Sequence, residues 1–444
     1  MSNTNPKHKI LRELLTHAGL FLLVILVLWA ALTTSAAIPN AAIKEHMLES
    51  AMGYGNADAF AFGNDSRWDG ITDNYADAIL LGVTWNMGVG DPIPAALNTR
   101  YYDGDELGEN GGLYLSVTEN IPANTDYTRY WHGMAALIRP LMLVMNADGI
   151  KLTGFIVLLA LILVSMAILV RRGHWQLALM LALSLILVDV WNVRLAMEYQ
   201  PGFLVTFALL PFWLIFERKS DRALTLLSVI SGTMIAFFDF LTTETLTILL
   251  PLILITAIRA KEDRLAGMKP MLRLLLFCGI AWGASYAAAY LVKWTAATFA
   301  MGDNAFALAF SGAAERIAGE INTSDNSVAK TIFSSITANF SILFTARARV
   351  EYLPTYLFTG GSMLILLSIW YIFRADTGKR DAALLLLMLG ALVPLRYFVL
   401  NNHSFLHCFF TYRALASTIL AAFLALWLNI RMGGKKPAKG GRRQ

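Results

Sequence analysis

Residues 150–170 read IKLTGFIVLLALILVSMAILV and are followed directly by Arg171 and Arg172. A stretch of about 20 mostly apolar residues is long enough to cross the hydrocarbon core of a bilayer as one helix. The rest of the chain has the same character, since 57% of its 444 residues are hydrophobic and only 15% are charged. Soluble domains are roughly 25% charged. The sequence therefore predicts an all-α integral membrane protein.

Further apolar stretches bring the predicted number of transmembrane helices to about ten. They are residues 18–37, 150–170, 175–192, 202–217, 222–240, 244–259, 271–293, 353–373, 381–400 and 414–431. Basic residues gather in alternate connections, at 171–172, 218–219, 259–273 and 374–380, and in the tail at 435–443. Because Lys and Arg favour the cytoplasmic side, this alternation predicts that both termini are cytoplasmic. Removing one span would place basic connections on both faces of the membrane.

The predicted spans divide the chain into five parts. These are a cytoplasmic N-terminus at 1–17, a first anchor at 18–37, an extracytoplasmic loop at 38–149, a helical bundle at 150–431 that includes an outer loop at 294–352, and a basic cytoplasmic tail at 432–444. The loop at 38–149 carries 15 acidic residues against 5 basic ones. Two apolar stretches within this loop, 76–90 and 134–147, are too short to span and predict helices at the membrane interface. Ser35-Ala36-Ala37 is similar to a signal-peptidase site, but we expect the first helix to be retained as an anchor.

The composition and the missing motifs argue against several classes of function. The net charge is +5, but the basic residues lie at membrane edges, so we expect no nucleic-acid partner. The chain has no Walker loop, dinucleotide-binding glycine pattern or nucleophile elbow, so ATP-driven, nicotinamide and esterase chemistry have no sequence support. Cys278 and Cys408 lack CxxC spacing, and we interpret both as packing residues.

Three aspartates at a spacing of four residues are the candidate catalytic groups. Asp69, Asp73 and Asp77 stand at the start of the first predicted interfacial helix, where Asp73 and Asp77 share one face. A carboxylate at a helix N-terminus is often only a cap. A carboxylate beside apolar surroundings can also have a raised pKa and accept a proton from an attacking hydroxyl. Both interpretations remain open at this stage, with Asp73 the first choice for a general base.

A second group of candidates lies at the end of the same loop. Trp131 is explained by the usual preference of aromatic residues for the membrane interface, but that preference does not explain His132 beside it. Arg139 stands in the middle of an apolar stretch, where an arginine usually has an anionic partner. That partner is either a protein carboxylate or a lipid phosphate.

Asp239 and Glu244 flank a short outer turn and therefore lie near the membrane surface. They are candidates for substrate binding, and structural pairing with Arg194 or Arg396 is the competing explanation.

The densest polar cluster is close to the C-terminus. It contains Arg396, His403, His407, Tyr412 and Arg413. The two histidines are four residues apart and would face one way on a helix, which is also the spacing of metal ligands. The sequence shows no third ligand, so we favour binding of a substrate phosphate, with the arginines supplying positive charge. The requirement for a divalent cation stays open.

The overall pattern resembles the polytopic membrane glycosyltransferases of the GT-C superfamily. The segments Asp69–Asp77, Tyr130–Gly133 with Arg139-Pro140, and Asn402–Arg413 also resemble bacterial envelope membrane proteins of this type. The resemblance implies a polyprenyl-phosphate or polyprenyl-diphosphate sugar donor used on the outer face, with an acidic residue of the first outer loop as base. Carried over, that residue is Asp73, with Asp69 and Asp77 as reserves. In many members this residue follows the first span closely, whereas here about 35 residues intervene.

Three functions follow as hypotheses. The first is transfer of a lipid-linked sugar to an envelope glycan or glycolipid acceptor in the bacterial inner membrane. In it Asp73 is the base, the phosphate is stabilised by Arg139, Arg396 and Arg413, and the ligand is oriented by His132, His403 and His407. The second is a transporter or flippase of envelope lipids, which would need charged residues along a path to both faces. The third is an acyl- or phospho-group transferase with His132 as base, whose rate should fall below pH about 6.5, whereas a carboxylate base should work lower.

Overall fold

The computed structural model describes residues 6–62, 70–302, 304–318, 328–345, 363, 366–374 and 378–430. Asp69 and most of the predicted span at 353–373 lie outside these residues. The described chain is almost entirely helical, with four short strands, which confirms the all-α class.

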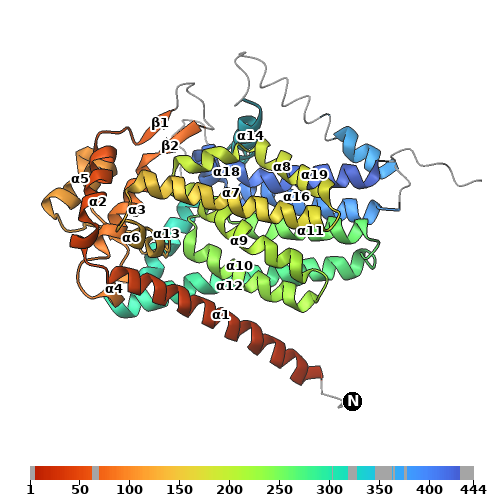
Figure 1. Ribbon diagram of the computed structural model, residues 1–444, viewed down its shortest axis with the longest axis horizontal. Coiled ribbons are helices and arrows are strands. Elements are labelled where there is room, and N and C mark those ends of the chain that lie inside the picture. Colours follow the sequence, from red (N-terminus) through yellow and green to blue (C-terminus); the bar gives the residue numbers. More distant parts are fainter. Residues whose placement is uncertain are drawn as a thin grey trace, which may run out of the picture.

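Long apolar helices form the body of the molecule and run roughly along one axis (Figure 1). They are α1 (Pro6–Ala36), α7 (Ala147–Arg171), α8 (Trp175–Leu187), α9 (Pro201–Phe216), α10 (Asp221–Phe238), α11 (Leu246–Lys261), α12 (Met268–Met301), α16 (Arg380–Val399) and α19 (Leu415–Asn429). Within the described residues, seven helical segments are long and apolar enough to cross a membrane. These are Lys7–Ala36, Ala147–Arg171, Met197–Phe216, Asp221–Phe238, Met268–Met301, Arg380–Val399 and Cys408–Asn429. The chain is therefore a membrane protein of the all-α class.

The first and the seventh predicted spans are longer than expected. α1 begins at Pro6, so much of the predicted cytoplasmic N-terminus is helical, and α12 continues to Met301. α12 has 34 residues, and at about 1.5 Å per residue it exceeds the thickness of the hydrocarbon core. α8, with 13 residues, is shorter than the span predicted at 175–192, whereas α11 has the 16 residues predicted for 244–259 and begins two residues later, at Leu246.

Polar turns meet at one end of the bundle. His174 Nε2 lies 3.1 Å from Glu262, and Arg264 donates to Glu217 at 2.6 Å. Lys379, just before α16, forms an ion pair with Asp263. The connections after α7, α9 and α11 and the start of α16 therefore lie together, as the alternating charge of the sequence predicts.

The opposite end carries a small outer domain (Figure 1). Its helices are α2 (Asn40–Gly55), α3 (Asn74–Asn86), α4 (Pro92–Leu97), η2 (Asp105–Leu107), α5 (Gly108–Glu119) and α6 (Ala135–Leu141). Two pairs of antiparallel strands complete it, β1 (Phe60–Phe62) with β2 (Ile71–Asp73) and β3 (Arg100–Tyr101) with β4 (Thr125–Asp126). Further helical pieces at this end are η3 (Val190–Leu195), η4 (Met197–Tyr199), α13 (Ala305–Ala318), α14 (Val328–Thr345), α17 (Asn401–Leu406), α18 (Cys408–Thr411) and η5 (Tyr412–Ala414).

The two helices predicted to lie at the interface are core elements of this domain. α3 buries ten of its 13 residues, and Leu81 and Trp85 pack in one cluster with Met47 of α2 and Leu113 of α5. The second predicted helix is broken: α6 ends at Leu141, and α7 begins at Ala147. An apolar stretch of this length can pack against protein as well as against lipid, and here α2 and α5 supply the apolar surface.

Candidate functional site

The outer domain and the C-terminal segment meet at the end of the bundle. The Phe60 ring of β1 lies 5.8 Å from the Phe409 ring of α18, and the Tyr199 ring of η4 lies 5.6 Å from the Phe410 ring. Segments separated by hundreds of residues thus converge at one junction, which we call the outer junction and define by Asp73, Tyr199 and Arg413.

Asp73 enters the outer junction from the last position of β2. Side chains alternate along a strand, so Ile71 and Asp73 are buried while Thr72 on the other face is partly exposed. Asp73 is also the N-cap of α3, since its Oδ1 accepts a hydrogen bond of 2.9 Å from the Ala76 N–H. The capping interpretation is correct as far as this oxygen is concerned. Among the described residues, no donor is bound to its second oxygen, Oδ2.

Burial changes the acid–base properties of Asp73. Only 2% of the residue is exposed, and this desolvation, with a smaller contribution from the Asp77 charge, raises the pKa of the carboxyl to about 7. A carboxylate with this pKa is well matched to accepting a proton near neutral pH.

Arg413 brings positive charge to the same junction. Its guanidinium carbon lies 4.8 Å from the Tyr199 ring centre and 5.0 Å from that of Tyr412, and it donates to the Phe409 carbonyl at 3.2 Å. The Tyr199 hydroxyl in turn donates to the Ile71 carbonyl at 3.1 Å. Tyr199 therefore connects the strand that carries Asp73 to the aromatic pair that holds Arg413.

Asp77, although on the same helix, has a different environment. Its Oδ2 accepts from the Tyr54 hydroxyl at 2.9 Å, and its Oδ1 accepts from the Met197 N–H at 2.7 Å. The Lys151 ammonium lies 3.9 Å away. Burial raises the pKa of Asp77 to about 6 despite the opposing effect of Lys151. Both oxygens are occupied, so Asp77 connects α2, α3 and η4 and has no oxygen left for a substrate proton.

Asp239, Glu244, Arg396 and His403 surround the turn after α10. Asp239 accepts from the Thr242 N–H at 2.9 Å and from the Thr242 hydroxyl. Both nitrogens of the Arg396 guanidinium that face Glu244 bind its carboxylate, and Arg396 also donates to the Leu241 carbonyl. His403 Nε2 lies 3.0 Å from the same carbonyl. Structural pairing of Glu244 with Arg396 is therefore present, whereas Arg194 lines a separate cavity.

The two C-terminal histidines lie next to each other. Their ring centres are 4.7 Å apart, and the His407 ring stacks on Phe410 at 5.2 Å. Across the part of the chain that the structure describes, no three His, Cys, Asp or Glu side chains are grouped as metal ligands.

Trp131 and His132 are buried where the outer domain packs on α10 and α12, and Arg139 is buried between α1, α2 and α3. The Trp131 indole donates to the Ala289 carbonyl at 2.9 Å, and its ring packs on Phe237. His132 has a φ of 53° and is 1% exposed, and its ring lies between Tyr127 and Phe240 at 5.0 and 4.8 Å. Burial lowers the pKa of His132 well below its usual value, so the ring is neutral.

Arg139 has oxygen partners of an unexpected kind. It donates to the carbonyls of Ser35 at 3.0 Å and Thr84 at 2.6 Å, to that of Ile38, and to Asn40 Oδ1 at 3.1 Å. Of the two anionic partners that the sequence predicted, a carboxylate of the described residues is not the one bound, because the partners of Arg139 among these residues are all neutral oxygens. The end of α1, the start of α2 and the last turn of α3 supply these neutral oxygens, so Arg139 holds these three helices in place.

Two further residues at the outer junction, Glu198 and Tyr199, are not among the candidates predicted from the sequence. Tyr199 and Glu198 follow directly in η4, and Glu198 is buried within electrostatic range of Asp73, Asp77 and Asp239. The sequence feature that could have identified them is an acidic residue next to an aromatic residue in the predicted outer connection at 193–201.

A polar cavity of about 610 Å³ opens beside the outer junction. Thr72 and Asn74, the two neighbours of Asp73, line it together with Tyr54, Lys151 and Arg194. Its size falls within the usual range of small-molecule sites, about 300–1,000 Å³. The cavity carries charges of both signs, since Glu49 and Asp148 also face it.

Comparison with known proteins gives no relative for this chain. It matches no protein family, no curated protein and no solved structure.

Proposed function

We propose that the protein is a membrane glycosyltransferase that moves a sugar from a polyprenyl-phosphate or polyprenyl-diphosphate donor to a cell-envelope acceptor. One observation carries the proposal: Asp73 is a buried carboxylate in the first outer loop, has one oxygen without a described donor, and lies at the junction where Arg413 is held. A base and a cation from distant parts of the chain are what sugar transfer from a lipid phosphate requires.

The proposed reaction inverts the sugar carbon. The acceptor hydroxyl oxygen attacks the anomeric carbon, its proton passes to Asp73 Oδ2, and the bond between that carbon and the phosphate oxygen breaks. The polyprenyl phosphate or diphosphate leaves with the bonding electrons, and Arg413 stabilises the charge that develops on it. In this proposal the acceptor approaches from the polar cavity past Asn74, which lines the cavity and directly follows Asp73 in the chain.

Glu244, Arg396 and His403 have a supporting role in this proposal. Arg396 has Glu244 as its counter-ion, so in this proposal it stabilises the turn after α10 and does not bind the phosphate. His403 lies on α17 and His407 in the turn between α17 and α18, and in this proposal both position the segment that leads to Arg413.

The proposal includes ten spans with both termini cytoplasmic, in a bacterial inner membrane. α8, α11 and residues 353–373 are added to the seven long helices to make ten. The shortness of α11 is compatible with a span because 14 of its 16 residues are buried among other helices. Labelling of single cysteines in intact cells tests this arrangement: a cysteine at Arg218 should be protected and one at Asp103 labelled by a membrane-impermeant reagent. The reverse pattern would overturn it.

The function is tested with the full-length protein in proteoliposomes that contain a synthetic polyprenyl-phosphate sugar with a radiolabel and an envelope glycan acceptor. We expect label in the acceptor together with released polyprenyl phosphate, because the sugar–phosphate bond is broken. Movement of intact donor between leaflets without release would instead support a transporter. If correctly folded protein shows neither sugar transfer nor donor movement with any sugar of a panel, the proposal is contradicted.

A further inference from the structure

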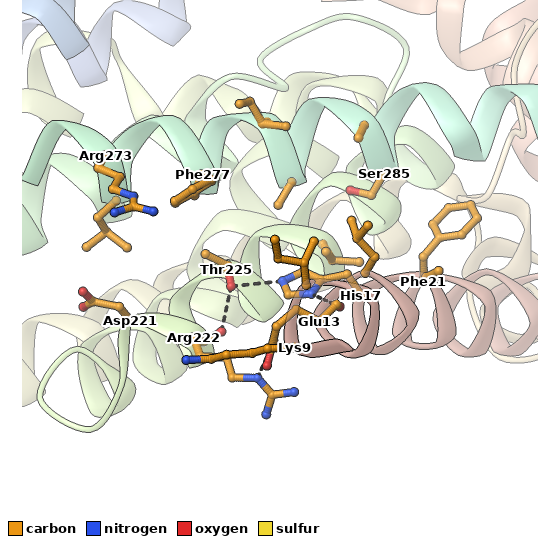
Figure 2. A pocket seen from close by; sticks show the side chains of 18 of the residues that line it. Lys9, Glu13, His17, Phe21, Asp221, Arg222, Thr225, Arg273, Phe277 and Ser285 are labelled. Carbon is orange, nitrogen blue, oxygen red and sulfur yellow. Dashed lines mark hydrogen bonds and ion pairs between the residues drawn. The ribbon is translucent and has the colours of Figure 1, made fainter. Parts of the chain in front are cut away.

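A second cavity lies far from the outer junction, beside the N-terminal half of α1 (Figure 2). It has a volume of about 980 Å³ and lies between α1, α10 and α12. α1 diverges from the bundle toward its N-terminus (Figure 1), and only 6% of its apolar segment is buried. This divergence leaves a groove, which we call the α1 groove.

The mouth of the α1 groove is at the basic end of the bundle and is rich in charge. Arg222 of α10 is paired with Glu13 of α1 at 2.7 Å, and Asp221 is paired with Arg259 at 2.7 Å. Figure 2 shows two further cations from opposite walls, Lys9 on α1 and Arg273 on α12.

The positive charges of Lys9 and Arg273, unlike that of Arg222, are not balanced by a carboxylate of the described residues. Neither forms an ion pair with a carboxylate of the described residues, and the Arg273 guanidinium contacts only the Phe277 ring, at 5.3 Å from its centre. The two carboxylates at the mouth already have partners. Three cations, Lys9, Arg222 and Arg273, and two carboxylates, Glu13 and Asp221, line the groove, so its mouth carries a net positive charge that attracts an anion.

The inner part of the α1 groove is apolar. It is lined by Leu14, Phe21, Phe277, Ile280, Ala284 and Ala288, and the side chains of Leu14, Phe277 and Ile280 are at least half exposed. Along α12, Ala288 lies 18 residues after Pro270, which corresponds to about 27 Å at 1.5 Å per residue. This length exceeds half of the ~30 Å hydrocarbon core, so the groove can hold an acyl chain along one leaflet.

We propose that the α1 groove binds one anionic phospholipid from the leaflet at the basic end of the bundle. Its phosphate lies between Lys9 and Arg273, and an acyl chain runs along the apolar walls toward Phe21 and Ala288. The cations provide the selectivity for a negative headgroup, and the apolar walls provide the requirement for a tail. This site is separate from the proposed transferase site, and neither depends on the other.

The test measures lipid retention by the full-length protein in native mass spectrometry, with equal amounts of phosphatidylglycerol and phosphatidylcholine. We expect the wild type to retain phosphatidylglycerol preferentially. The double variant Lys9→Gln/Arg273→Gln should retain about tenfold less phosphatidylglycerol, because both cations that attract the phosphate are removed. A tenfold change corresponds to about 1.4 kcal/mol of binding free energy. The matched control is Arg12→Gln/Lys269→Gln, which removes two exposed cations of the same helices that do not line the groove. It should behave as the wild type.

A second variant tests the tail separately from the charge. Ala284→Trp fills the apolar part of the groove with the cations intact and should lower phosphatidylglycerol retention, whereas Leu163→Trp on the exposed face of α7 should not. Equal retention of both lipids by the wild type, or unchanged retention in Lys9→Gln/Arg273→Gln, would overturn the proposal. A dimer cross-linked through cysteines at Ala284 would also overturn it, because a second copy would then fill the groove.

Discussion

Replacing Asp73 by Asn is expected to lower sugar transfer by about 10²–10⁴-fold, the usual contribution of a positioned general base. Asn is as good an N-cap as Asp, so the hydrogen bond from Ala76 and the start of α3 are kept. Only the ability to accept the acceptor proton is lost. The measurement is the initial rate of transfer in proteoliposomes, with the melting temperature of the same preparation taken in detergent.

The matched control for this variant is Asp77→Asn on the next turn of α3. The amide NH₂ of Asn replaces one carboxylate oxygen, which accepts a hydrogen bond from the Tyr54 hydroxyl or the Met197 N–H. A buried donor left without its acceptor lowers the free energy of unfolding by about 1–3 kcal/mol. We therefore expect lower stability with the transfer rate per folded molecule largely retained. Near wild-type transfer by Asp73→Asn would remove Asp73 from the mechanism, and the single replacement Asp69→Asn would then test the reserve aspartate.

The second large effect is expected at the ion pair between Glu244 and Arg396. Their side chains are each about 6% exposed, so the variant Glu244→Ala leaves a buried guanidinium without its counter-ion. Removing one partner of a buried pair costs about 3–5 kcal/mol. The free energy of unfolding, from denaturation of the protein in mixed micelles, measures this loss.

Two comparison variants separate this effect from a general loss of charge. The double variant Glu244→Leu/Arg396→Met replaces the pair by apolar residues and should recover most of the stability, because no unpaired charge remains. Arg100→Ala breaks a pair with Asp126 whose side chains are 35% and 40% exposed. The loss there should stay below about 1 kcal/mol. Equal losses in Glu244→Ala and Arg100→Ala would show that the buried pair is not a structural anchor.

The main features of the bundle could be predicted from the sequence because they depend on local properties. Apolar length identified most long helices, and the alternating basic turns predicted which helix ends lie together. The capping role of Asp73 was also local, since it depends on the first turn of α3 alone. Helix ends were less predictable: α12 continues to Met301, beyond its predicted end at 293, and α8 ends at Leu187, before its predicted end at 192.

The candidate site depended on contacts that no local pattern contains. The neutral oxygens that bind Arg139 come from three helices, and Tyr199 becomes part of the junction only because η4 packs against β2 and α18. The same packing reverses an expectation about pH. A carboxylate base was expected to work at lower pH than His132, but burial raises the pKa of Asp73 and lowers that of His132.

The pH dependence of kcat/KM for sugar transfer tests the central claim most directly. Asp73 can accept a proton only when it is ionised, and burial raises its pKa to about 7. We therefore predict that kcat/KM is constant above about pH 8 and falls toward tenfold per pH unit below pH 7, and that Asp73→Asn lacks this fall in its residual activity. A profile that stays flat from pH 8 to pH 5, or the same fall in Asp73→Asn, would contradict the assignment of Asp73 as the base.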